Sequence, residues 1–328
     1  MIDNERRQEL NQTKFDVLLR KAFPDSQFEK VHAISAAVRS NGQEMYVYAP
    51  DQSISPLAIA MALPLPETKI NVVLDEPDSL LILQAEGLKK EYIFWIIEDE
   101  TMVYHPDEDY VAQPVKHILD APIISILEAN NCDIVHEHEI VKAEIKGLEV
   151  ARITEDRDGE LKLQIGVGHY DQEAHKLVDL HEDPNEKLAR VVADVLRYRN
   201  KEAKPHPLNR VARPAWLVSE IIAFPEKLNL QDVHRLMTPG KATTVKETTP
   251  AAALAKSDGK IVLLVASVGI DLKAIPLAAA LSATEDADEI WMILPEKDLH
   301  PALKRQSSQL TIPIYIKTVQ ETWPATLD

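Results

Sequence analysis

The chain has 328 residues, 45% of them hydrophobic and 27% charged, which is typical of a globular protein with two or three domains rather than a disordered chain. Its formal net charge of −17 argues against nucleic-acid binding by the whole surface, because neutralising phosphates requires clustered lysine and arginine. A single cysteine, Cys132, excludes a disulfide framework and a multi-thiolate metal site, and the polar start and lack of a run of about 20 apolar residues predict a cytoplasmic protein with no membrane partner.

Residues 1–117 are predicted to form an α/β unit. Ser55 and Asp78 are suitable N-caps, Pro56 suits the first position of a helix, and Gly87 suits a helix end. Three near-continuous apolar runs are typical of strands buried on both faces of a parallel sheet. The expected order is a helix at 10–23, a strand at 45–50, a helix at 55–63, a strand at 69–76, a helix at 77–88 and a strand at 92–99.

Residues 118–237 have a different pattern, which predicts a central α+β domain with antiparallel strands. The pair Asp158-Gly159 is a strong signal for a hairpin between the last two of its strands. The predicted elements are a helix at 121–130, strands at 133–145, 147–153 and 161–168, a helix at 185–199, a proline-rich loop and a helix from Trp216.

The segment 238–259 lacks apolar periodicity and is predicted to be a linker. Residues 260–328 then repeat the N-terminal pattern at a constant shift of 220, which aligns Pro56 with Pro276 and Asp78 with Asp298. The predicted fold class is α/β, with two related βαβαβ, Rossmann-like units flanking the central domain. Because a unit of this size buries little apolar surface alone, we expect the C-terminal unit to pack on the N-terminal one, either in one doubly wound sheet or side by side.

The stretch GHYDQEAH, at 168–175, combines imidazoles with carboxylates. In a strand, His169, Asp171 and Glu173 would share one face; in a helix, residues four apart would meet. Upstream, His136 and His138 have a spacing that also suits a metal ion. These five residues form a hypothetical metal site, and the alternative is a polar exit from a strand.

Glu149 and the Glu160-x-Lys162 pair lie on two strands that are expected to be neighbours. Carboxylates and a lysine in this arrangement can hold Mg²⁺ or Mn²⁺ and orient an attacking water. The order helix, three strands, helix resembles the PD-(D/E)xK nuclease superfamily, which implies Glu149, Glu160 and Lys162 as catalytic residues. The chain lacks the Pro-Asp of that motif, and if the motif position were 164–166 the lysine would be absent and the domain inactive.

Positive residues concentrate between positions 187 and 213, where nucleic acid is a candidate partner. One interpretation is an anion-binding patch, and the other is a solvated helix face followed by a basic loop. The patch would contain Arg197, Arg199, Lys204, Arg210 and Arg213.

Polar residues follow the predicted strands of both α/β units, at the edge where open α/β sheets bind ligands. Their acidity would suit a cation or an amine better than a phosphate, and the alternative is that they cap helices. They are Asp75, Glu76 and Asp78 in the first unit, and Glu296, Lys297 and Asp298 in the second. A separate motif with Ser267, Gly269 and Asp271 also lies at the carboxyl end of a predicted strand.

The segments GLEVARI, LQIGVGHYDQEA, HPLNRVARPAWL, VASVGIDLKAIPLAAA and LPEKDLHPALKR together resemble an uncharacterised protein family associated with actinobacteria. That resemblance implies no activity. Two functions therefore follow as expectations. One is a nuclease-like, metal-dependent protein, either active or degenerate, that acts on nucleic acid. The other is a non-enzymatic ligand-binding or assembly scaffold that uses the cleft between the two α/β units.

Overall fold

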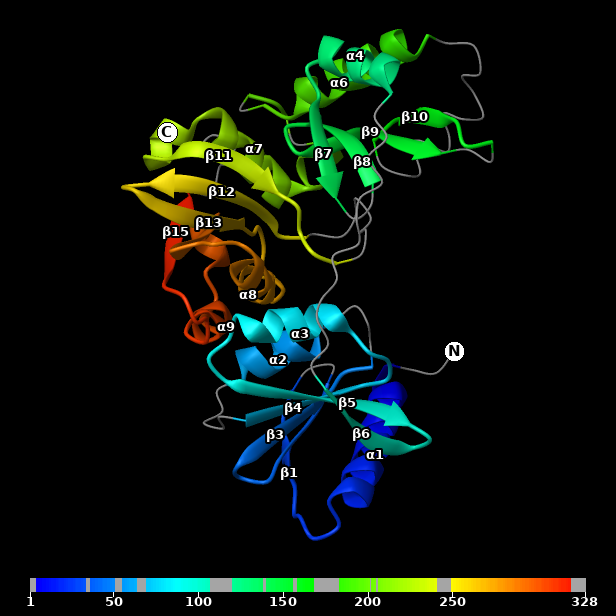
Figure 1. Ribbon diagram of the computed structural model, residues 1–328, viewed down its shortest axis with the longest axis vertical. Coiled ribbons are helices and arrows are strands. Elements are labelled where there is room, and N and C mark those ends of the chain that lie inside the picture. Colours follow the sequence, from blue (N-terminus) through cyan, green and yellow to red (C-terminus); the bar gives the residue numbers. More distant parts are fainter. Residues whose placement is uncertain are drawn as a thin grey trace. The chain divides into compact units, whose positions relative to one another are not determined.

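The protein is of the α/β class, with its described strands arranged in three sheets (Figure 1). The helices that are described include none long and apolar enough to cross a membrane. The chain forms two compact units, of which the first contains Met1–Val111, Ile275–Asp286 and His300–Ile314, and the second Ala112–Ala274, Ala287–Leu299 and Tyr315–Asp328. The computed structural model describes residues 4–33, 36–50, 55–63, 69–106, 120–137, 140–155, 158–167, 183–200, 202–204, 206–240 and 249–319.

The first unit contains a six-stranded sheet with the strand order β1-β2-β3-β4-β5-β6. Strands β3, β4 and β5 are parallel neighbours, whereas the remaining pairs are antiparallel. The predicted parallel strands are thereby found, and β1, β2 and β6 extend the sheet beyond them. The bounds are β1 Glu29–Val31, β2 Ala37–Ser40, β3 Glu44–Tyr48, β4 Lys69–Leu74, β5 Glu91–Glu98 and β6 Thr101–His105.

Helices cover both faces of this sheet (Figure 1). Helix α1 (Asn4–Ala22) buries Phe15, Leu18 and Leu19 against tyrosines of β3. Helices α2 (Pro56–Ala62) and α3 (Ser79–Glu86) connect the parallel strands. Their predicted caps are confirmed, because the Ser55 side chain accepts a hydrogen bond from the Ala58 amide and that of Asp78 from the Leu80 amide.

The first unit also includes helices α8 (Ala274–Thr284) and α9 (Pro301–Ser307) from the C-terminal part of the chain. Helix α9 packs on α2, where the Gln306 side-chain amide donates to the carbonyl of Ala58 at 2.9 Å. Gly87, at the end of α3, lies so close to α8 that a Cβ atom there would be 2.2 Å from the carbonyl oxygen of Ala279.

The second unit contains an antiparallel sheet with the order β10-β9-β8-β7. Residues 133–145, predicted as one strand, are two strands that pair as β7 (Asp133–Glu137) and β8 (Ile140–Ile145). They are followed by β9 (Leu148–Glu155) and β10 (Leu161–Ile165). Helices α4 (Ala121–Ala129) and α6 (Pro184–Tyr198) bury their apolar faces on this sheet.

The other sheet of the second unit has the order β11-β12-β13-β14-β15. Its strands are β11 Gln231–Leu236, β12 Ala251–Ser257, β13 Lys260–Ala266, β14 Glu289–Pro295 and β15 Ile314–Val319. Helix α7 (Arg213–Ala223) packs on it through Trp216, Leu217 and Ile221.

The predicted linker 238–259 is wrong for residues 251–257, which form β12. Alanines give this segment little apolar signal, yet they suit a strand that is buried between two others. The turn Asp258-Gly259 has φ values of +49° and +78°, a pattern that joins two antiparallel strands tightly.

The two α/β segments share one order of elements, but they contribute to different sheets. Each runs helix, three antiparallel strands, helix, strand, helix, strand: α1, β1–β3, α2, β4, α3, β5 and α7, β11–β13, α8, β14, α9, β15. They therefore do not complete one doubly wound sheet. The strands β4 and β14 begin 220 residues apart, at Lys69 and Glu289, but the caps of α3 and α9 are Asp78 and His300, which are 222 apart. The predicted shift of 220 therefore holds for β4 and β14, whereas aligning α3 with α9 requires two additional residues before α9.

Candidate functional site

Several charged side chains, Glu149 among them, lie on the polar face of the β7–β10 sheet. A β-bulge shifts the register between β8 and β9, because Glu144 pairs with Glu149 whereas Ala143 pairs with Ala151. Val150 is the extra residue, and beyond it Lys142 pairs with Arg152. Lys142 and Glu144 of β8, and Glu149 and Arg152 of β9, consequently lie on the face opposite the apolar core.

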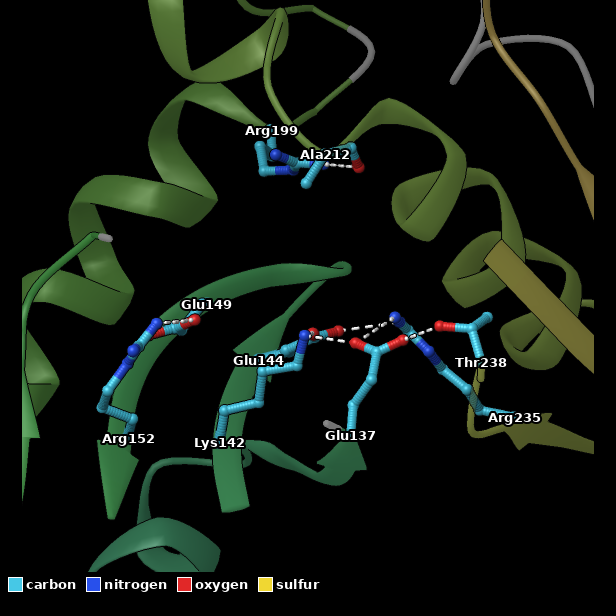
Figure 2. Close-up of polar contacts among 9 residues, drawn as sticks. All are labelled: Glu137, Lys142, Glu144, Glu149, Arg152, Arg199, Ala212, Arg235 and Thr238. Atoms are coloured by element: carbon cyan, nitrogen blue, oxygen red, sulfur yellow. Dashed lines mark hydrogen bonds and ion pairs between the residues drawn. The ribbon is translucent and has the colours of Figure 1, made fainter. Parts of the chain in front are cut away.

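Two buried carboxylates on this face, Glu137 and Glu144, are 8% and 2% exposed. Lys142 bonds to Glu137 and lies 3.1 Å from Glu144, while Arg235 of β11 donates to Glu144 at 2.8 Å. The hydroxyl of Thr238 donates to Glu137 at 2.7 Å. Figure 2 shows these five side chains pointing toward one another from both sheets of the second unit.

The electrostatics of this network favour ionised carboxylates. Burial alone would raise the pKa of Glu137, but the charges of Lys142 and Arg235 and the bond from Thr238 outweigh it and lower the pKa to about 2. The pKa of Lys142 is raised, because Glu144 and Glu137 outweigh its burial. Removing one member of a buried ion pair typically costs about 3–5 kcal/mol, since the other charge is left uncompensated. The network can therefore hold β11 on β7 and β8.

Glu149, predicted to be catalytic, is 8% exposed and pairs with Arg152 through two hydrogen bonds of 2.6 and 2.9 Å. Lys162 lies opposite Thr154 in the β9–β10 ladder. Glu149 and Thr154 are five residues apart, so roughly 16 Å of strand separates the backbone positions of Glu149 and Lys162. Glu160 precedes β10. The structure therefore does not bring the three side chains to one point within a few ångströms, as a shared metal ion would require.

Of the predicted metal ligands, only His136 lies within the described residues. It is half-buried on β7, next to Glu137, whose side chain points to the opposite face of the strand. His138, His169, Asp171 and Glu173 lie outside the described residues. Within the part of the chain that is described, no group of three or more histidine, cysteine, aspartate and glutamate side chains could hold a metal ion.

Arg199 adds no exposed charge to the predicted anion-binding patch, because its side chain is fully buried. Its guanidinium donates to the carbonyls of Leu208, Val211 and Ala212 at 3.0 to 3.1 Å and lies 4.4 Å from the ring centre of Trp216. Burial lowers the pKa of Arg199 to about 9. This arginine fixes the loop between α6 and α7, and Figure 2 shows it apart from the carboxylate network.

The other four residues of that patch are not equivalent to one another. Arg197, Lys204 and Arg210 are exposed, on the last turn of α6 and on the following loop. Arg213 is half-buried at the start of α7, where burial lowers its pKa and Asp298 partly offsets the effect. Exposed charge therefore remains on the helix end and the loop, while Arg199 and Arg213 turn inward.

The carboxyl ends of β3 and β4 carry a polar triad that sequence reasoning missed. Lys14 of α1 donates to Asp75 and to the Tyr48 hydroxyl, both at 2.8 Å, and Tyr48 also bonds to Asp75. The acidity of this strand end was expected to attract an amine, and here the amine is a side chain of the same unit. Burial would lower the pKa of Lys14, but the bonds to Asp75 and Tyr48 outweigh it and raise the pKa.

The corresponding acids of the second α/β segment contact backbone amides. Asp298 accepts a hydrogen bond from the Gly269 amide at 2.7 Å, and Asp271 accepts one from the Lys273 amide at 2.8 Å. Burial raises the pKa of Asp271. The contact of Asp271 agrees with the capping interpretation, because Lys273 directly precedes α8. Asp298 instead bonds to the loop after β13, and α9 is capped by His300.

Sequence signals for the ion network were present but incomplete. The run Ile140–Ile145 alternates, placing Lys142 and Glu144 on one face of a strand. Their partner Arg235 is 91 residues from Glu144, and no local pattern could join them. Comparison of the chain with protein-family models, curated proteins and solved structures found no match.

Proposed function

We propose that this chain is a non-enzymatic scaffold built from two related α/β modules and a central α+β region. The observation that carries this proposal is that Glu149, a predicted catalytic residue, and the two buried carboxylates of the same sheet are each held in ion pairs inside the second unit. Glu149 is paired with Arg152, and Glu137 and Glu144 with Lys142 and Arg235.

The similarity of the two α/β segments is the second support for this proposal. The shared order of eight elements extends the sequence repeat from α2–β5 back to α1 and α7, and it supports a duplication of one Rossmann-like module. A duplicated module provides two similar surfaces on one chain, which suits assembly better than it suits a single reaction. The module surfaces, rather than the sheet face with the ion network, are then the parts that meet other molecules.

The competing proposal is the metal-dependent, nuclease-like function, in which Glu149 would bind Mg²⁺ or Mn²⁺. It would require the Glu149 carboxylate to leave Arg152, because an arginine bonded to both oxygens competes directly with a cation. The nucleic-acid partner of that proposal would have to bind through the exposed Arg197, Lys204 and Arg210 without Arg199.

Calorimetric titration separates the two proposals. Mg²⁺, Mn²⁺ and Zn²⁺ are titrated into full-length, metal-free protein and into the variants Glu149→Gln and Glu155→Gln; Glu155 lies at the exposed end of the same strand and serves as the matched control. The scaffold proposal expects the same weak, non-saturating heats from all three proteins. Micromolar binding that is lost in Glu149→Gln and kept in Glu155→Gln would overturn it in favour of the metal-dependent function.

A further inference from the structure

The chain segments that directly follow α3 and α9 contact each other in a nearly symmetric way. Leu88 and Leu310 form an isolated antiparallel bridge. The Lys89 amide donates to the carbonyl of Gln309 at 2.8 Å, and the Thr311 amide donates to the carbonyl of Gly87 at 3.0 Å. A shift of 222 converts each of these two hydrogen bonds into the other, and it places Leu88 on Leu310.

The same shift is obtained independently from the helices themselves. It aligns the caps of α3 and α9, and it aligns the pattern Leu-x-x-Gln-x-x-x-Leu in both. In the first copy Leu81, Gln84 and Leu88 are 5%, 8% and 6% exposed, and in the second copy the residues at 303, 306 and 310 are 7%, 0% and 1% exposed. The residues of this pattern, Leu88 and Leu310 of the bridge among them, are therefore identical in sequence and similarly buried.

Contacts around the bridge involve corresponding helices, although one is made by backbone and the other by a side chain. Gly87 touches the backbone of α8 at Ala279. Its equivalent, Gln309, touches the backbone of α2, where its side-chain amide donates to the carbonyl of Met61 at 2.8 Å. Helices α2 and α8 are the corresponding helices of the two modules. Each helix end thus packs on the first crossover helix of the other module, and Figure 1 shows α9 beside α2.

We infer that residues 84–89 and 306–311 are two copies of one self-complementary interaction surface, whose fitting partner is a second copy of itself. An isologous contact, in which residue i meets j and j meets i, is the contact of a twofold dimer. In this chain the two copies pair within one unit. When two chains meet before that internal pairing is made, the same surface pairs between them, Leu88 with Leu88 and Leu310 with Leu310. This inference goes beyond the proposed function, since it holds whether or not the chain is a scaffold.

Disulfide trapping in the full-length protein tests it. In an antiparallel pair whose members do not exchange hydrogen bonds, as at Leu88 and Leu310, the Cα atoms are about 4.5 Å apart, which is within the range of a disulfide. Leu88→Cys and Leu310→Cys are made separately in a Cys132→Ser background. Each is refolded from urea at high protein concentration in a glutathione buffer, and disulfide-linked dimers are measured on non-reducing gels.

The control is Leu264→Cys, a residue 1% exposed in the core of the second unit. Self-complementarity predicts that Leu88→Cys and Leu310→Cys each form several-fold more homodimer than the control, with a native circular dichroism spectrum. The inference is overturned if both match the control, or if dimers form only when the two variants are mixed, since the segments would then be complementary without being copies. Because the two positions are equivalent, either variant decides the question if the other fails to refold.

Discussion

Replacing Arg199 by methionine is expected to destabilise the protein strongly, although this residue was first assigned to an anion-binding patch. The substitution keeps an apolar stem of similar length and removes the guanidinium. Three backbone carbonyls, those of Leu208, Val211 and Ala212, then lose their donor. The contact of the cation with the ring of Trp216 is lost as well.

The magnitude follows from these contacts. A buried acceptor left without a donor costs about 1–3 kcal/mol, and a desolvated cation–π contact contributes about 1–2 kcal/mol. One opposing effect exists: burial lowers the pKa of Arg199 to about 9, so the charge itself is costly to bury and its removal recovers free energy. The net loss should be roughly 2–4 kcal/mol, a large part of a total stability of about 5–15 kcal/mol.

Urea unfolding monitored by circular dichroism and tryptophan fluorescence measures this loss. Arg197→Met is the matched control, because Arg197 lies on the same helix two residues earlier and is exposed; it should change the stability by less than about 0.5 kcal/mol. Arg199→Lys should lie between the two, because an ammonium keeps the charge but cannot reproduce the guanidinium's geometry. The reasoning fails if Arg199→Met costs no more than Arg197→Met, or if it leaves stability unchanged and abolishes the binding of inorganic phosphate.

Three further predictions concern the second unit. The pKa of Glu137 is about 2 in the folded state and 4.5 in the unfolded state. Ionised Glu137 therefore contributes about 3 kcal/mol to stability above pH 4.5, and this contribution is lost as the pH falls toward 2. Urea titrations at several pH values should show that loss in the wild type and a smaller loss in Glu137→Gln. Gly147→Ala should destabilise the protein by several kcal/mol, because its Cβ would lie 2.3 Å from the Ala215 backbone. The control Gly259→Ala has a similar positive φ and nothing within 4 Å, so it should cost only about 1 kcal/mol in the same assay. Equal losses would contradict the close approach at Gly147. Burial, with a contribution from the neighbouring Asp133, raises the pKa of Cys132 to about 11 from 9.0, so its alkylation at pH 8 should be about 100-fold slower in folded than in unfolded protein, and comparable rates would refute the burial.

Local patterns in the sequence determined much of the fold. Continuous apolar runs identified β3, β4 and β5, and Ser55 and Asp78 marked helix starts because their side chains satisfy amides that a helix leaves unpaired. The shared order of helices and strands in the two α/β segments was visible in part, because both segments carry apolar strand runs at a similar spacing. Those features depend on neighbours within a few residues, so a single sequence contains them.

Tertiary structure alone decided the register and the partners of the charges. The alanine-rich strand β12 is stable because β11 and β13 flank it, which its own composition could not reveal. Glu149 was nominated for a metal, but a bulge and Arg152 direct its carboxylate into an ion pair; Arg199 was nominated for an anion, but the chain folds three carbonyls onto it. The sequence alone does not show whether a charged side chain faces solvent, a ligand or a buried partner. The packing of distant segments determines which of these surrounds it, and the free energy of a charge depends on those surroundings.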